Sequence, residues 1–215
     1  MVSHRTAALA GMIGPAAFAF IVVVLTFAEY GFLARLGWDP VGVSDVPWPS
    51  ALALGPLGWL QVLNFAFFGL TLIVFALGLH RGVASRGRGS WAGPVLLVVA
   101  GVALVLAAFK ADLYLSEGPR TWHGWIHLLA FVLLVLSMLL SLFFWWWRLR
   151  RDPLWRGYDL YTLITAIAYV ALLFVSAWQW GFYLFLAVIL AWIEEMAIRL
   201  HAAENASARR PPRVR

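Results

Sequence analysis

The dominant pattern along the chain is an alternation of long apolar runs with short polar connections. Six runs reach the length of about 20 residues that a helix needs to cross a bilayer. They occupy residues 7–30, 57–79, 94–114, 122–147, 158–178 and 180–199. The pattern therefore predicts an all-α integral membrane bundle, with six transmembrane helices in a domain over residues 1–200. The polar segment 201–215 is predicted to be a disordered tail, because it has too few apolar residues to fold.

Two segments near the N-terminus admit more than one interpretation. The first run has a basic start, but its apolar core is longer than the roughly 7–15 residues of a signal peptide and contains Gly14-Pro15. We interpret it as an uncleaved helix. The longest connection, residues 31–54, is broken by Pro40, Pro47 and Pro49, and Trp38 is of a type that suits the membrane interface. We expect an ordered extramembrane loop there, with a re-entrant segment as the alternative.

Composition supports the membrane assignment and narrows the class of partner. The chain is 63% hydrophobic and 12% charged, whereas soluble domains average about half and a quarter. Its net charge of +6 does not indicate nucleic-acid binding, because the basic residues lie in short clusters between apolar runs. The sequence has no cysteine, which excludes disulfides, thiolate metal ligands and a cysteine nucleophile.

The arginines predict the orientation of the spans. Most of them lie in the N-terminal segment, the connections after the second and fourth runs, and the C-terminal tail. The opposite side holds Arg35, Arg120 and the border residue Lys110. By the positive-inside rule, both termini are predicted to be cytoplasmic in a multi-pass protein of the inner membrane.

This threading brings several polar side chains to one level near the outer surface. They are Glu29, Gln61, Asn64, Lys110, Asp112, His123 and His127. Such groups are costly within a bilayer and therefore mark a functional site by default. We expect an outward-facing polar site formed by Asp112, His123 and His127, with the other four residues around it.

The histidine spacing suggests a metal site. His123 and His127 at i,i+4 lie on one helix face, where two imidazoles can bind one metal ion. Asp112 would add a carboxylate and leave a coordination position open for water, as in catalytic zinc sites. The alternative is that His127 hydrogen-bonds Asp112 or Gln61 and simply fastens two helices together. Haem bound by two histidines of one chain is disfavoured, because two residues on one face cannot flank a porphyrin.

Several short motifs along the chain carry a resemblance to a known family. They are Gly55-Pro56-Leu57-Gly58-Trp59, Asn64-Phe65, Gly69, Phe109, Asp112, Thr121, His123-Gly124 and His127. In these motifs the chain resembles the bacterial membrane-protein family catalogued as domain of unknown function 998. The resemblance implies a polytopic inner-membrane protein in which Asp112, His123 and His127 match the polar positions of the family. It implies no reaction.

Three functional hypotheses follow, and the question of enzymatic activity stays open among them. In the first, the outward-facing site binds a divalent metal such as zinc, or a polar head group of a lipid-like molecule drawn from the membrane. In the second, the chain is an accessory or structural subunit of a larger membrane complex, which its thirteen tryptophans and apolar faces would suit. The third, a small-molecule transporter, lacks the inverted repeat or broken helix pair typical of that class.

Overall fold

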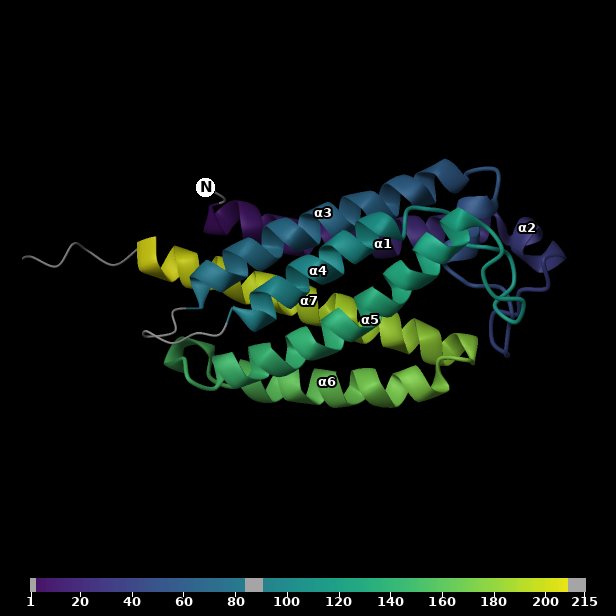
Figure 1. The fold of residues 1–215 in the computed structure, drawn as a ribbon. Helices are drawn as coiled ribbons and strands as arrows, with labels where there is room; N and C mark the ends of the chain where they lie inside the picture. Colours follow the sequence, from purple (N-terminus) through teal and green to yellow (C-terminus); the bar gives the residue numbers. More distant parts are fainter. Residues whose placement is uncertain (1–2, 84–90, 209–215) are drawn as a thin grey trace, which may run out of the picture.

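The fold is a ring of six long helices, seen in a computed structural model that describes residues 3–83 and 91–208 (Figure 1). The long helices are α1 (His4–Ala28), α3 (Gly58–Gly82), α4 (Ala92–Leu106), α5 (Trp122–Leu149), α6 (Tyr158–Val175) and α7 (Gln179–Ala208). The short elements are α2 (Tyr30–Arg35) and the 3-10 helices η1 (Ser50–Leu54) and η2 (Pro153–Trp155). Within the described ranges no strand forms, apart from an isolated bridge between Val43 and Trp178. The predicted all-α class is confirmed.

The helices pack in chain order and close on themselves. Each of α1, α3, α4, α5, α6 and α7 contacts the next, and α7 returns to contact α1 and α3. The start of α1 and the end of α7 lie at the same end of the bundle, which we call the inner end (Figure 1). At the opposite, outer end lie α2, η1, the α4–α5 connection and the turn between α6 and α7 (Figure 1).

Five helices are long and apolar enough to cross a membrane: α1, α3, α5, α6 and α7. The chain is therefore a multi-pass membrane protein by length and composition. The predicted third span is shorter than expected, since α4 has 15 residues and is about 22 Å long, against about 30 Å of hydrocarbon. Lys110 and Asp112 consequently lie in an irregular connection, and not at the end of a helix as predicted.

Small residues allow α3 and α4 to approach closely. A Cβ atom added to Gly69 on α3 would lie 2.5 Å from the carbonyl oxygen of Gly101 on α4. A Cβ atom on Gly101 would in turn lie 2.8 Å from the carbonyl oxygen of Gly69. Close backbone contact at glycine is a common means of helix association in membranes, where apolar surface gains nothing by leaving lipid.

The long connection after α1 is an ordered segment that covers the outer end of the ring. We call residues 36–57 the cap segment. The Trp38 indole N–H donates to Gln179 Oε1 (3.2 Å), and the Trp48 indole N–H donates to Thr26 Oγ1 (3.0 Å). Trp38 is 6% exposed, so it is a packing residue and not the interfacial residue predicted. The cap segment thus joins α1 to the start of α7.

The last helix extends further than the sequence suggests. α7 continues to Ala208, so residues 201–208 of the predicted tail are helical, while residues 209–215 lie outside the described residues. The predicted start of the last span at residue 180 is close to the observed start at Gln179. The tight turn expected between the last two spans is present at residues 176–178.

Candidate functional site

A pocket of about 430 Å³ lies at the outer end of the bundle. Its walls come from the cap segment, the α4–α5 connection and the outer ends of α5, α6 and α7. The polar side chains in its lining are Ser44, Ser50, Asp112, Tyr114, His127, Ser176 and Gln179. No lysine or arginine of the described chain is among the lining residues. The volume falls in the range of about 300–1,000 Å³ that is typical of small-molecule sites.

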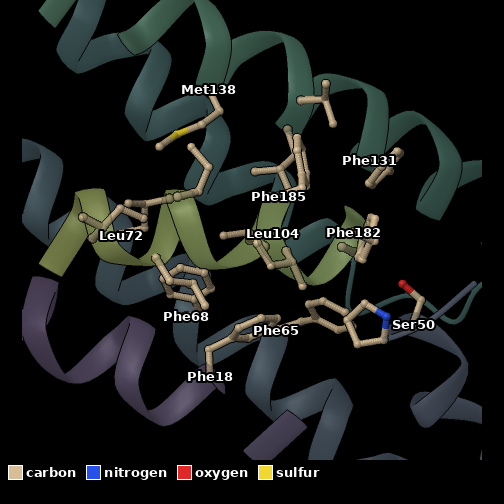
Figure 2. Close-up of a pocket in the computed structure, with 18 of the residues that line it drawn as sticks. Phe18, Ser50, Phe65, Phe68, Leu72, Leu104, Phe131, Met138, Phe182 and Phe185 are labelled. Atoms are coloured by element: carbon tan, nitrogen blue, oxygen red, sulfur yellow. The ribbon is translucent and has the colours of Figure 1, made fainter. Parts of the chain in front are cut away.

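A second, apolar cavity of about 90 Å³ lies inside the ring (Figure 2). All six long helices contribute to its lining, which includes Phe18, Phe65, Leu72, Leu104, Met138, Tyr169 and Phe185. Figure 2 shows Ser50 at one end of this cavity, near Phe131 and Phe182, and Leu72 and Met138 toward the other end.

Four residues line both spaces: Ser50, His127, Phe131 and Phe182. The outer pocket and the inner cavity are therefore adjacent, with a hydroxyl and an imidazole at their border. Most of the polar lining residues belong to the outer pocket, which also has apolar walls that include Leu128, Leu173 and Phe174, while aromatic and aliphatic groups line almost all of the inner cavity. Polarity therefore decreases from the outer pocket to the inner cavity.

His127 is the central polar residue of this border. Its Nδ1 atom lies 2.7 Å from the Phe109 carbonyl oxygen and 2.9 Å from that of Ala107. Its Nε2 atom lies 2.9 Å from Ser50 Oγ. Because carbonyl oxygens only accept hydrogen bonds, Nδ1 must carry the proton of the neutral ring. Nε2 is then an acceptor, and the Ser50 hydroxyl donates to it.

These bonds explain why α4 ends where it does. Ala107 follows directly after α4, and its carbonyl belongs to the set of C-terminal carbonyls that a helix leaves without an intrahelical donor. The His127 ring supplies that donor from the second turn of α5. His127 is 8% exposed, so the unpaired carbonyls would otherwise be largely cut off from water.

Asp112 anchors the start of α5. Its Oδ2 atom accepts from the backbone N–H of Arg120 (2.6 Å) and of Thr121 (3.0 Å), and its Oδ1 atom accepts from the Thr121 hydroxyl (2.8 Å). A Cβ atom on Gly124 would lie 2.0 Å from Oδ2, so glycine is needed for this approach. The hydrogen bonds from Thr121, backbone first, lower the pKa of Asp112 below its ordinary value of 3.8.

His123 is also occupied by local bonds. Its Nδ1 atom lies 2.8 Å from the Lys110 carbonyl oxygen and 3.0 Å from Thr121 Oγ1. The Lys110 side chain is exposed. Across residues 3–83 and 91–208, no group of three or more histidine, aspartate or glutamate side chains is arranged to hold a metal ion. The metal hypothesis therefore gains no support from the described residues.

The remaining predicted site residues form a separate cluster. Asn64 Nδ2 donates to the Phe18 carbonyl on α1 and to Gln61 Oε1, both at 3.2 Å. Glu29 Oε1 accepts from the backbone N–H of Leu57 at 2.5 Å. All three side chains are buried, and they line neither space. They fasten α1 to α3, so the seven polar residues do not share one site. Asp112 and His127 line the outer pocket, and His123 and Lys110 line neither space.

Ser50 is the residue of this site that sequence reasoning missed. It lies in a proline-rich connection, in the run Pro47-Trp48-Pro49-Ser50, and carries no recognisable motif. Its partner is 77 residues away along the chain, and the two meet because the cap segment folds back over α5. A search for serines near a histidine in sequence would not have found this pair.

Comparison with known proteins gives a family and no activity. A family model described as "Protein of unknown function (DUF998)" matches residues 47–198. This range includes Ser50, Asp112, His123 and His127, and it begins after α1. The resemblance inferred from the short motifs is thereby confirmed. No significant match was found among curated proteins or among solved structures.

Proposed function

Because the chain belongs to this family of unknown function, DUF998, we propose a function from its geometry: it binds a neutral, single-chain lipid-like molecule. The head group occupies the outer pocket, and the alkyl chain enters the apolar cavity. The observation that carries the proposal is the shared border, where Ser50 and His127 line both spaces. A molecule with a polar head group and an apolar chain would fit across this border, because most of the polar lining residues lie on its outer side.

The lining favours an uncharged, hydroxyl-bearing head group. Phosphate and carboxylate groups are bound in proteins by arginine, lysine or helix N-termini. No lysine or arginine among the described residues lines the pocket, and the backbone N–H of Gln179 at the start of α7 donates to the Gly42 carbonyl. The one carboxylate there, Asp112, already accepts three hydrogen bonds from the start of α5. The Gln179 amide oxygen accepts from Trp38, the Ser44 oxygen accepts from the Val46 N–H, and the Ser176 hydroxyl donates to the Leu173 carbonyl. The amide N–H groups of Gln179, the hydroxyl hydrogen of Ser44 and the oxygen of Ser176 can still bond glycerol or sugar hydroxyls.

The apolar side of the site has room for a short part of an alkyl chain. Its volume of about 90 Å³ is smaller than the roughly 150 Å³ of an engineered cavity that takes up benzene. The proposed ligand therefore has a short alkyl chain, and Leu128, Leu173 and Phe174 of the outer pocket form the wall past which it enters. Phe174 is 82% exposed, so this wall borders the surrounding lipid, and we propose entry from the outer leaflet between α5 and α6.

We further propose that α4 and the connection after it form a sixth crossing, with both termini cytoplasmic in the inner membrane. Two observations support this. α4 packs between α3 and α5 in the closed ring. The ends of α3 and α5, which carry Arg81 and Arg148, lie at the inner end together with the start of α1 and the end of α7 (Figure 1).

Photo-crosslinking with a monoacylglycerol that bears a diazirine on its acyl chain tests the binding. The variant Leu134→Trp fills the apolar cavity, which Leu134 lines. Displacing about two methylene groups costs about 1.6 kcal/mol, which corresponds to roughly a tenfold loss of affinity. Leu136→Trp is the matched control, because Leu136 lies on the same helix, is 54% exposed and lines neither space.

We expect labelled peptides from α5 and α7 in the wild type and in Leu136→Trp, and weak labelling in Leu134→Trp. Unlabelled monoacylglycerol should compete. Equal labelling of all three proteins, or labelling that the competitor leaves unchanged, would mean that the probe reports only the lipid-facing surface, and the proposal would be abandoned.

A further inference from the structure

The contact between Ser50 and His127 has the arrangement of a nucleophile with its general base. Ser50 Oγ lies 2.9 Å from His127 Nε2, within the range of about 2.6–3.2 Å over which a base takes a hydroxyl proton. The hydroxyl is the donor in this bond, because Nδ1 faces two carbonyl oxygens and holds the ring hydrogen.

The third component of such sites is a group that orients the base. In serine hydrolases a carboxylate accepts from Nδ1, holds the tautomer and stabilises the imidazolium that forms. Here the carbonyl oxygens of Ala107 and Phe109 take that place at 2.9 and 2.7 Å. Their dipoles are aimed at Nδ1 and favour a positive charge on the ring, so the proton transfer from Ser50 is assisted by fixed backbone groups.

Ser50 and His127 also lie where the ester bond of a bound lipid would be. In an ester of glycerol or a sugar, the carbonyl group joins the polar head to the alkyl chain. If the head occupies the outer pocket and the chain enters the apolar cavity, the ester carbonyl lies at the border formed by Ser50 and His127. This step rests on the proposed function. It adds that the bound lipid is a substrate and not only a ligand.

We propose that the protein is a membrane esterase for neutral single-chain lipids, with Ser50 as nucleophile and His127 as general base. Ser50 Oγ attacks the ester carbonyl carbon while His127 Nε2 takes its proton. The bond from that carbon to the alcohol oxygen then breaks, and His127 returns the proton to the departing oxygen. The products of this half-reaction are the free alcohol and an acyl group on Ser50.

Water completes the cycle. It attacks the acyl carbonyl carbon and gives a proton to His127 Nε2, and Ser50 Oγ leaves with that proton. The net reaction is ester plus water to fatty acid plus alcohol, with the protein regenerated. The outer pocket supplies the water, since His127 and Ser50 both line it.

A purely structural role is the competing explanation, in which the bond only fastens the cap segment to α5. A fluorophosphonate probe separates the two, because it phosphonylates a serine only when a base activates its hydroxyl. We expect mass spectrometry of the probe-treated full-length protein to find the adduct on Ser50. Ser50→Ala should abolish it, and Ser137→Ala, which changes a buried serine of α5 outside both spaces, should not.

The variant His127→Asn tests the base without removing the anchor. The asparagine amide can still donate to the carbonyls of Ala107 and Phe109, but it offers no nitrogen acceptor to Ser50. We expect the rates of probe labelling and of monoacylglycerol hydrolysis in micelles to fall by about 10²–10⁴-fold, the usual contribution of a general base. If Ser50→Ala fails to fold, the labelling and hydrolysis rates of His127→Asn still test the proposal.

The outcomes distinguish this inference from the proposed function. Photo-crosslinking of the monoacylglycerol probe without any phosphonylation of Ser50 or any hydrolysis would leave the binding function standing and overturn the esterase. Hydrolysis that persists in both Ser50→Ala and His127→Asn would overturn it as well. Loss of photo-crosslinking in the wild type would remove the proposed function, and the esterase with it.

Discussion

Replacing His127 by alanine should destabilise the protein strongly, because the ring holds three elements together. Its two nitrogens bond the end of α4 and the first residue of η1, and the ring also packs against Phe65 of α3 at a centroid distance of 6.3 Å.

The magnitude follows from two contributions. Removing the donor leaves the carbonyls of Ala107 and Phe109 unpaired, which costs about 1 kcal/mol each, the low end of the range for an unsatisfied buried group. Deleting the buried ring adds about 2–3 kcal/mol, the low end for large-to-small substitutions. The free energy of unfolding of His127→Ala should thus fall by roughly 4 kcal/mol, equivalent to about 8–16 °C in Tm for a chain of this length.

Two further variants make the measurement specific. His127→Asn restores a donor to the carbonyls, so its free energy of unfolding should fall by only about 1–2 kcal/mol. His123→Ala is the matched control, since His123 lies one turn earlier, is only partly buried and bonds the Lys110 carbonyl at the edge of the structure. We expect this variant to lose less than about 1 kcal/mol. Thermal unfolding in one detergent, followed by circular dichroism, compares all four proteins. If His127→Ala and His123→Ala unfold within about 2 °C of each other, the bonding assigned to His127 is wrong.

Three other predictions address the surrounding structure. Gly69→Ala should lower the free energy of unfolding by about 1–3 kcal/mol through overpacking, because the added Cβ would lie 2.5 Å from the Gly101 carbonyl oxygen. An unchanged Tm would show that α3 and α4 are further apart than this contact requires. The pKa of Asp112 is lowered by the Thr121 hydrogen bonds, so its contribution to stability is present above about pH 4 and is lost as the pH falls through the folded-state pKa. In Asp112→Asn, the free energy of unfolding should therefore fall less steeply with decreasing pH than in the wild type. Parallel plots of unfolding free energy against pH for the two proteins would contradict this. Metal analysis of purified protein should find zinc well below one per chain, since His127 is committed to other bonds; stoichiometric zinc that His127→Ala loses would instead establish the metal site.

The sequence was sufficient to predict the helices but not where each of them ends. Apolar runs of about 20 residues identify helices that cross a membrane, and five of the six predicted spans qualify in the structure. The exception, α4, ends within a run that remains apolar from Val105 to Phe109. Nothing in its composition marks that end, and the group that bonds its terminal carbonyl, His127, is 20 residues further along the chain.

The candidate site could be located from the sequence but not assembled correctly. The arginine distribution predicted that Asp112 and His127 share one end of the bundle, and both do line the outer pocket. Which way Gln61 and Asn64 face depends on how α3 is rotated against α1, and that rotation is set by packing in three dimensions. Ser50 depends on the course of an irregular connection, for which hydrophobic periodicity carries no information.

At the outer end, backbone N–H groups hold three acidic side chains in place. Glu29, Asp39 and Asp112 each accept from a backbone N–H, and a glycine lies against each carboxylate: Gly55, Gly42 and Gly124. The missing side chains allow the carboxylates to approach the backbone, whose dipoles then stabilise the charge. The acidic residues that stand out in the sequence are therefore occupied in holding the outer end together. The chemistry that remains available in the pocket belongs to a hydroxyl and an imidazole that pair without any carboxylate between them.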